Sequence, residues 1–413
     1  MPGPGKRQLK MAQTPRDVGR MVKHLGGLPK SERAAREPFE LGRAAMAAFK
    51  WDEAIVHFRK AMSKAKGTQL VALLNLIGLC QYASDRPVDA LRDYEESARL
   101  AEEFGDKQGK AADLGNIGNI YSAKGEPDRA LKYYEEALAI YRKTAYQPGV
   151  ANQLGNIALI HNAKGDLDQA LTCQQEALAI YRKIGYQPGV ANALGNIGLI
   201  HSAKGEPDKA LKCYDEALAM DREFGYQRGA ADQLGNIGLA HSAKGEPDKA
   251  LKYHEEALAI YREIGYQPGV ANQLGGIGNV YRAKGEPERA LMYSVEALAT
   301  YREIGYQPGV ASALSNLGNA YVRAMQMRMT APRAAARDKE VAGLAAKAIE
   351  HLVPALAMFL EMGIADGPRQ CLWGLDECCK VLGREEFVAL CVRAGMSKEK
   401  AEGLAEAKPE AME

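Results

Sequence analysis

The sequence predicts an all-α solenoid, a fold in which helix pairs stack one on another along the chain. First, the sequence repeats with a period of 40 residues, and the segment HSAKGEPDKALK at 201–212 returns unchanged at 241–252. Second, apolar residues within each unit recur at i, i+3, i+4 and i+7, which is the spacing of one helix face. Third, glycine and proline stand at the ends of the apolar segments, where helices end and begin.

Each unit contains two amphipathic helices, for example over residues 190–204 and 207–224. Gly205 lies where a left-handed residue ends the first helix, and Pro207 falls in the first turn of the second. Asp208 follows, where a carboxylate favours the positive end of a helix. Two antiparallel helices joined by so short a turn cannot bury both apolar faces alone, so neighbouring pairs must stack into a continuous core.

The recurring residues resemble the signature of the tetratricopeptide repeat family. In the unit that begins at Ala111 the signature positions hold Ile117, Gly118, Tyr121, Ala130, Tyr134 and Ala137. The same register finds a first repeat at Gly42, Ala54, Phe58 and Ala61 and a second at Gly78, Ala90 and Tyr94. The resemblance implies a right-handed superhelix of about eight repeats plus a C-terminal helical cap. The 40-residue unit is similar to the variety in kinesin light chains and Pins-type adaptors.

Three regions are expected along the chain. Residues 1–34 form a basic arm, since the first 50 residues carry 11 Lys and Arg against four acids. Residues 35–363 form the solenoid, and residues 364–413 form capping helices around Trp373 and after Gly383, followed by a tail. The arm has the composition of a solvated tail, with nucleic acid or an acidic partner as the alternative ligand.

The last repeat contains an insertion of 18 residues, at about 325–342, between its two helices. Eighteen residues make five helical turns at about 3.6 residues per turn, so an extended helix keeps its face in phase. We therefore expect the first helix to end near residue 324 and a longer second helix to start near Thr330, without disturbing the stack.

Several classes of protein are not indicated. No apolar run approaches the roughly 18 residues of a membrane span, and the first 35 residues lack the apolar block of a secretory signal, so a cytoplasmic location is expected. No P-loop, HExxH or GxSxG motif is present, so we expect no catalytic residue, cofactor or metal.

The seven cysteines lack a CxxC pair, and Cys371 and Cys378 fit a buried stripe. His161, His201 and His241 replace tyrosine at one helix position and are interpreted as packing residues.

A ladder of polar side chains marks the first helix of each pair, at the spacing i, i+4, i+7 that defines one face. Its members are Asn116, Asn119, Asn152, Asn156, Asn192, Asn196, Asp232, Asn236, Asn272, Asn279, Asn316 and Asn319. The family resemblance implies that this face lines the concave groove. An amide is both donor and acceptor, which suits the backbone of an extended peptide. The alternative is that asparagine here only stabilises helix packing.

Two further features accompany the ladder. Mid-helix glycines recur beside it, at Gly115, Gly155, Gly195, Gly235 and Gly275. Each should cost about 1 kcal/mol relative to alanine, so they serve either ligand approach or tight packing against a neighbouring helix. The carboxylate clamp of chaperone-binding relatives is not evident, and Arg282 and Arg323 are the basic residues placed to accept an acidic side chain.

These observations predict a scaffold or adaptor that binds an extended or helical segment of another protein and is not an enzyme. One alternative is a peptide-responsive regulator, in which ligand binding switches an effector surface. A third is a nucleic-acid-associated repeat protein that uses the basic arm and Arg328, Arg333 and Arg337 of the insertion. The partner, the cellular process and the oligomeric state are not specified by these patterns.

Overall fold

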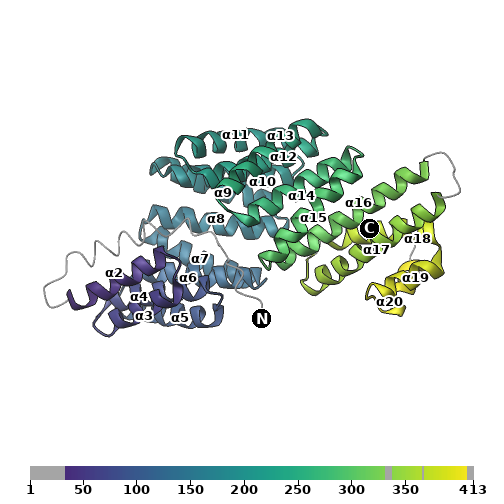
Figure 1. The fold of residues 1–413 in the computed structure, drawn as a ribbon. Helices are drawn as coiled ribbons and strands as arrows, with labels where there is room; N and C mark the ends of the chain where they lie inside the picture. Colours follow the sequence, from purple (N-terminus) through teal and green to yellow (C-terminus); the bar gives the residue numbers. More distant parts are fainter. Residues whose placement is uncertain (1–32, 331–336, 365–366, 407–413) are drawn as a thin grey trace. The chain divides into compact units, whose positions relative to one another are not determined.

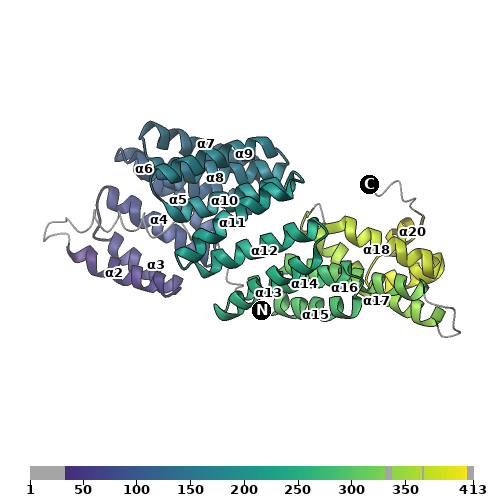
Figure 2. The same cartoon turned by 90° about the horizontal axis from the view of Figure 1, so that it is seen from above.

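The computed structural model describes residues 33–330, 337–364 and 367–406, and these ranges contain helices and turns but no strand. Figures 1 and 2 show the helices following one another as antiparallel pairs. The predicted all-α, helix-pair architecture is confirmed. The described residues divide into two compact units, whose boundary lies between Gly205 and Glu206. Of the predicted basic arm, residues 1–32 lie outside the described ranges.

The unit before the boundary contains four helix pairs and the first helix of a fifth. Each helix packs mainly on the helices that precede and follow it in sequence. The helices are α2 (Arg33–Ala47), α3 (Trp51–Met62), α4 (Thr68–Ala83), α5 (Pro87–Glu103), α6 (Lys107–Ala123), α7 (Pro127–Lys143), α8 (Gln147–Lys164), α9 (Leu167–Lys183) and α10 (Gln187–Ala203).

The unit after the boundary begins with the second helix of the fifth pair and continues through three more pairs to the capping helices. The helices are α11 (Pro207–Glu223), α12 (Gln227–Ala243), α13 (Pro247–Glu263), α14 (Gln267–Ala283), α15 (Pro287–Glu303), α16 (Gln307–Thr330), α17 (Arg337–Glu361), α18 (Gly367–Leu382), α19 (Arg384–Arg393) and α20 (Lys398–Glu406). Eight pairs with a C-terminal cap were predicted, and both are present.

Helix ends follow the glycine and proline pattern. Gly205 has a φ of 70°, and its N–H donates to the carbonyl of Ser202 at 3.0 Å, so it ends α10 as predicted. Pro207 then occupies the first turn of α11, where its missing N–H leaves no helical bond unmade. Helices α10 and α11 differ from the expected ranges by only a few residues at their ends.

The core of several pairs depends on close contact between a glycine and an aromatic ring. A Cβ atom built on Gly118 would lie 2.6 Å from a ring carbon of Tyr134, which is buried. Gly269 and Tyr261 repeat the arrangement at the joint between one pair and the next. The glycines therefore admit rings that any larger residue would displace.

Ion pairs of constant spacing join consecutive pairs through their turns. The ammonium nitrogen of Lys164 lies 2.9 Å from Asp128 Oδ1, and the same contact recurs at later repeats. The later pairs are Lys204–Asp168 (2.5 Å), Lys244–Asp208 (2.7 Å) and Lys284–Asp248 (2.8 Å). The aspartates are exposed and the lysines are partly exposed, so each pair contributes at most about 1 kcal/mol.

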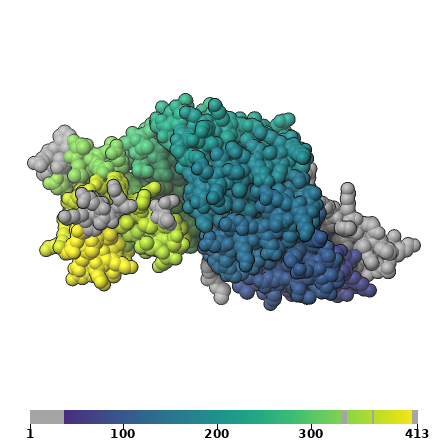
Figure 3. All heavy atoms as spheres, turned by 180° about the vertical axis from the view of Figure 1, so that it is seen from behind, coloured from purple at the N-terminus to yellow at the C-terminus, as the bar shows by residue number. Residues whose placement is uncertain are grey.

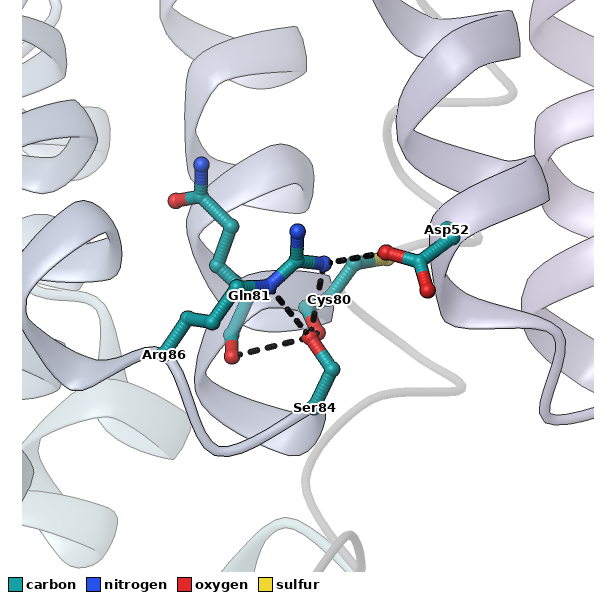
Figure 4. Close-up of polar contacts among 5 residues, drawn as sticks. All are labelled: Asp52, Cys80, Gln81, Ser84 and Arg86. Carbon is teal, nitrogen blue, oxygen red and sulfur yellow. Dashed lines mark hydrogen bonds and ion pairs between the residues drawn. The ribbon is translucent and has the colours of Figure 1, made fainter. Parts of the chain in front are cut away.

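The first repeats keep this link with different residues. Arg86 donates to Asp52 Oδ1 at 2.6 Å and to the hydroxyl of Ser84 at 2.9 Å (Figure 4). The Ser84 hydroxyl in turn donates to the carbonyl of Cys80 at 2.8 Å, which fixes the turn between α4 and α5. As in the later repeats, an aspartate in the first turn of a pair's second helix, here Asp52 of α3, contacts a cation from the next repeat, here Arg86.

The insertion in the last repeat is arranged differently from our expectation. We expected α16 to end near residue 324 and the second helix to start near Thr330, but α16 continues to Thr330 and α17 begins at Arg337. The insertion therefore lengthens both helices, and its residues 331–336 lie outside the described ranges. Met325 and Val341 are buried, so the two extensions pack on each other rather than leaving the core untouched. Arg328 and Glu340 also form an ion pair at 3.0 Å across this contact.

The capping helices complete the second unit (Figure 3, yellow). Helix α18 packs on both α16 and α17, and Gln326 donates to Glu377 at 2.9 Å between α16 and α18. Cys371 and Cys378 are buried as predicted, and all seven cysteines are free thiols. Burial raises the pKa of Cys378 to about 12, so this thiol is unreactive at neutral pH.

One helix in the described ranges, over Asp338–Glu361, is long and apolar enough to cross a membrane by length and composition, which we did not expect. The same segment forms α17, whose Ile349, Leu352 and Leu356 are buried in the core of the second unit. Its apolar character is therefore explained by packing on α16 and α18.

Candidate functional site

The polar ladder lies on the first helices, which are adjacent within each unit. Helix α6 contacts α4 and α8 in one unit, and α14 contacts α12 and α16 in the other. We divide the ladder into three rows by position in the repeat. The first row is Asn152, Asn192, Asp232 and Asn272. The second row is Asn116, Asn156, Asn196, Asn236 and Asn316, and the third row is Asn119, Asn279 and Asn319.

First-row side chains are bonded to tyrosines of their own helix pair. The Tyr181 hydroxyl donates to Asn152 Oδ1 at 2.6 Å, and the Tyr261 hydroxyl donates to Asp232 Oδ1 at 2.5 Å. Tyr301 donates to Asn272 in the same way. The constant separation of 29 residues in sequence was available as a signal for these bonds, but sequence reasoning missed it. The first row therefore has a structural role in holding the two helices of a pair together.

Asn192 is the exception in the first row, because Asp221 occupies the place that tyrosine has in the other pairs. Asn192 Oδ1 instead accepts from the amide of Asn196 at 2.9 Å. Asp221 is buried, and this burial raises its pKa to about 6, with a hydrogen bond from Gln233 opposing the shift.

Most second-row amides are available. Asn116, Asn156, Asn236 and Asn316 are half-buried, and their side chains form no hydrogen bond within the described ranges. Gly276 interrupts this row, because a Cβ there would lie 2.8 Å from the buried His254 ring. In one unit, the adjacent helices α6 and α8 thus each present a free amide at the same position.

The third row is heterogeneous. Asn119 Oδ1 accepts from the Tyr134 hydroxyl at 2.9 Å, and Asn279 is half-buried. Asn319 is only 4% exposed, because α18 covers it and a Cβ on Gly374 would lie 2.7 Å from its Oδ1. Asn319 was predicted to contact a partner, and this is wrong because the cap occupies that part of the face.

Leucines replace asparagine at the third-row position in the central repeats, which sequence reasoning did not note. Leu199 is 41% exposed and Leu239 is 56% exposed, while Leu159 is half-buried. In the first unit, Leu159 and Leu199 lie one turn from the second-row residues Asn156 and Asn196 on α8 and α10. The face therefore combines free amides with exposed apolar side chains.

The two candidate arginines lie at the C-terminal end of this face in the second unit. Arg282 on α14 is half-buried, and its Nε atom is buried without a hydrogen-bond partner. Arg323 on α16 is exposed, and one of its terminal nitrogens lies 4.0 Å from a Cβ built on Gly285, in the turn that follows α14. Burial and the nearby charge of Arg323 lower the pKa of Arg282.

The mid-helix glycines have two different environments. A Cβ on Gly115 would lie 2.8 Å from the side-chain amide of Gln153, and one on Gly235 would lie 2.7 Å from that of Gln273. These two glycines serve tight packing against the next first helix. Gly155 has open space around it, since the next first helix carries Ala193 in place of glutamine.

Candidate residues for metal or acid–base chemistry have other roles. Among the described residues, no group of three or more His, Cys, Asp or Glu is placed to hold a metal ion. His241 stacks on Tyr253 with ring centroids 5.4 Å apart, as expected of a residue that replaces tyrosine in packing. Its Nδ1 lies 2.6 Å from Glu246, at the turn to the next helix.

Comparison with solved structures gives relatives of similar architecture but low sequence identity. The apo form of the quorum sensor NprR from B. thuringiensis is 16% identical, with a TM-score of 0.55 over 92% of this chain and 99% of that one. The Rap protein complexed with Competence and Sporulation Factor is 14% identical, with a TM-score of 0.53 over 87% and 99%. A putative kinesin light chain from P. anserina, with nearly identical repeats, is 15% identical, with a TM-score of 0.42 over 49% and 99%.

Sequence comparison identifies the family. No curated protein matches the sequence. The family model described as tetratricopeptide repeat matches residues 68–143, 149–223 and 229–303, which together are more than half of the chain. The match covers most of the repeats in which the helix pairs, the signature glycines and the ladder were described above. The chain therefore belongs to the tetratricopeptide repeat family.

Proposed function

We propose that this protein is a non-catalytic scaffold or adaptor, which binds an extended or helical segment of another protein along its first-helix face. The observation that carries the proposal is the second row, in which four half-buried amides, those of Asn116, Asn156, Asn236 and Asn316, form no hydrogen bond within the described ranges. An unbonded amide can donate to a partner carbonyl and accept from a partner N–H. Exposed leucines beside the row add apolar contacts for the partner's side chains.

The spacing of the row suits an extended segment. Helices pack about 8 to 10 Å apart, and an extended chain rises about 3.3 Å per residue, so one amide would meet about every third residue of the partner. Backbone contacts of this kind give affinity, whereas the neighbouring leucines would select the side chains. Because nothing in this interaction requires another compartment, we also propose a cytoplasmic location.

The solved relatives favour one more specific form of the proposal. One is a Rap protein complexed with Competence and Sporulation Factor, and another is the quorum sensor NprR. A ligand-responsive regulator is therefore the second candidate function for this chain. It would differ from a passive scaffold in having a second conformation that the bound ligand favours.

A nucleic-acid-binding role is not favoured by the insertion. Arg328 forms an ion pair with Glu340, so its charge is already neutralised, while Arg333 lies outside the described ranges and the side chain of Arg337 is not described. A measurement of affinity against salt would detect such binding, because neutralising phosphates makes affinity fall steeply as salt increases.

The test compares the second row with the first. A double Asn116→Ala, Asn156→Ala variant removes two free amides from the adjacent helices α6 and α8 of one unit, and we expect 12-residue peptides selected from a random display library on the wild-type protein to bind it more weakly. Each amide is worth about 0.5 to 1.5 kcal/mol, so affinity should fall about fivefold to 150-fold if the terms add. The thermal midpoint should not fall, since alanine is the better helix former and no buried partner is left unpaired.

Asn152→Ala is the matched control, because it leaves the Tyr181 hydroxyl without its partner. This variant should lose roughly 1 to 3 kcal/mol of stability and lose less affinity than the double variant. Unchanged peptide affinity in the double variant, together with a lower melting midpoint, would show that the second row is structural.

A further inference from the structure

The first-helix face of the second unit ends in a pair of cations that no described acid neutralises. Arg282 and Arg323 come from the adjacent helices α14 and α16. Within the part of the chain that the structure describes, neither side chain forms an ion pair, and Arg282 Nε is buried without a hydrogen-bond partner. The pair is therefore unlike an ordinary surface arginine.

Neighbouring arginines show the usual arrangement in this protein. Arg262 on α13 lies 2.8 Å from Glu296 on α15, and Arg289 lies 3.2 Å from Glu286. Arg228 stacks on Tyr266, with its guanidinium carbon 4.1 Å from the ring centroid. Arg282 thus stands out as a half-buried guanidinium that lies beside another cation, Arg323.

This arrangement is unfavourable in the free protein. Burial removes water from the Arg282 guanidinium without supplying a full set of acceptors, and repulsion from Arg323 adds to the cost. An anion placed between the two side chains would remove both costs at once. Two guanidinium groups provide several donors in fixed planes, a geometry that matches the oxygens of a carboxylate.

Two amide side chains that form no hydrogen bond within the described ranges lie on the same helices as the two arginines. Asn279 lies one turn before Arg282 on α14, and Asn316 lies two turns before Arg323 on α16. Both are half-buried and without a hydrogen bond inside the described ranges. A peptide backbone held by Asn316 would therefore bring a neighbouring side chain within reach of the arginines.

We propose that Arg282 and Arg323 bind the carboxylate of an acidic side chain in the peptide segment that lies on the first-helix face. This inference rests on the proposed function, and it specifies the chemistry of the partner near one end of the site. The partner would thus carry an Asp or Glu at one fixed position. An anionic group on the partner complements the charge of this unneutralised cation pair.

The experiment uses 12-residue peptides selected from a random display library on the full-length protein. We expect an Asp or Glu to be enriched at one position of the selected peptides. Replacing that acid with its amide in the tightest peptide should weaken binding to the wild-type protein by at least about tenfold. The same replacement should have little effect on binding to the Arg323→Gln variant, because the charge that the acid would meet is reduced.

Two matched variants control for folding and for general charge. Arg323 is exposed, so Arg323→Gln should keep the wild-type melting midpoint even if Arg282→Gln does not fold. Arg262→Gln removes a cation that is paired with Glu296 on the second helices, and it should leave peptide affinity unchanged. Equal losses in Arg262→Gln and Arg323→Gln would indicate only a general effect of net charge and would overturn the inference.

The remaining outcomes separate the inference from the proposed function. Selected peptides that bind through the second row but show no acidic preference would overturn the inference and leave the proposed function standing. A phosphoserine peptide that binds the arginine pair, while its glutamate analogue binds no better than its glutamine analogue, would show that the ligand is phosphate and not carboxylate. If no peptide is selected and an oligonucleotide binds in an Arg323-dependent manner, both proposals are wrong.

Discussion

Single residues decide how closely the first helices approach one another, and two kinds of glycine show this. Gly115 and Gly235 face a glutamine amide from the next first helix, whereas Gly155 has open space. Glycine in a helix costs about 1 kcal/mol relative to alanine, so its retention at Gly115 is explained by the contact with Gln153. Packing against glutamine therefore explains the glycine at this position in two repeats, but it does not explain Gly155.

Replacing these glycines should give opposite results. Gly115→Ala and Gly235→Ala should lower the unfolding free energy by about 1 to 3 kcal/mol, because the new methyl group would lie within 3 Å of a buried amide. Gly155→Ala should raise it by up to about 1 kcal/mol. Urea unfolding of the three single variants checks this prediction. Destabilisation of the same size in all three would show that the glutamine contact is not the cause.

A second prediction at this scale concerns a carboxyl group in the core. Asp113 on α6 is fully buried, and it accepts a hydrogen bond from Asn75 at 2.6 Å, while its second oxygen has no partner. Burial raises its pKa to about 8 from an ordinary value near 3.8, so the neutral form is favoured in the folded protein. Its contribution to stability is fully present below pH 4 and is lost as the pH rises towards 8.

Asp113→Asn should remove this pH dependence while keeping an acceptor for Asn75. Relative to the wild type, the variant should therefore gain stability between pH 4 and pH 8, by a few kcal/mol if the whole shift is expressed, since one pKa unit corresponds to about 1.4 kcal/mol. Melting midpoints of both proteins over this pH range provide the measurement. A constant difference in melting midpoint across this pH range would mean that the pKa of Asp113 is the same in the folded and unfolded states.

At the scale of elements, the extensions of α16 and α17 show how the repeat accommodates an insertion. Both helices grow towards the insertion, and the added turns bury Met325 against the same core as Val341. Lengthening a helix by whole turns keeps its apolar face in phase, so the added residues extend the existing interface. The insertion is therefore part of the core, and we expect its removal to destabilise the protein.

Two methionines on α16 test whether the extension is part of the core. Met325 is 0% exposed and Met327 is 42% exposed, although they are two residues apart on one helix. Met325→Ala should destabilise the protein by about 2 to 5 kcal/mol through the cavity that it leaves, and Met327→Ala should change stability by less than about 0.5 kcal/mol. Equal melting midpoints for the two variants would contradict the packing described above.

For the whole molecule, the order in which helices contact one another along the chain predicts how the protein unfolds. Helices pack mainly on their neighbours in sequence, so stability is close to a sum over repeats and their interfaces. The division into two units at Gly205 adds a place at which cooperativity can break. Unfolding should therefore occur in more than one step, with the terminal repeats opening first.

Hydrogen exchange measures this directly. Amide protection should be greatest within residues 150–300 and should decrease towards both ends of the described chain. A control with Lys164→Ala and Lys244→Ala removes one inter-repeat ion pair from each unit, and it should accelerate exchange only slightly because exposed pairs are weak. Uniform protection from end to end would show that the repeats unfold as one cooperative unit.

The sequence by itself determined the helix pairs, their ends and the family. Helix periodicity and the positions of Gly205 and Pro207 are local properties, because they depend on residues within one or two turns. The ladder was likewise visible as a pattern on one helix face. For this reason the positions of the first helices and the candidate face could be predicted from the repeat pattern alone.

Only the tertiary structure decided which ladder residues are available. The bond between Asn152 and Tyr181 joins two helices, the covering of Asn319 depends on α18, and the roles of Gly115 and Gly155 depend on the residue that the next helix places opposite them. Each of these facts is set by side chains that meet across helix interfaces, which the periodicity of one helix does not encode. Packing therefore leaves only part of the predicted ladder without hydrogen bonds among the described residues, namely Asn116, Asn156, Asn236, Asn279 and Asn316.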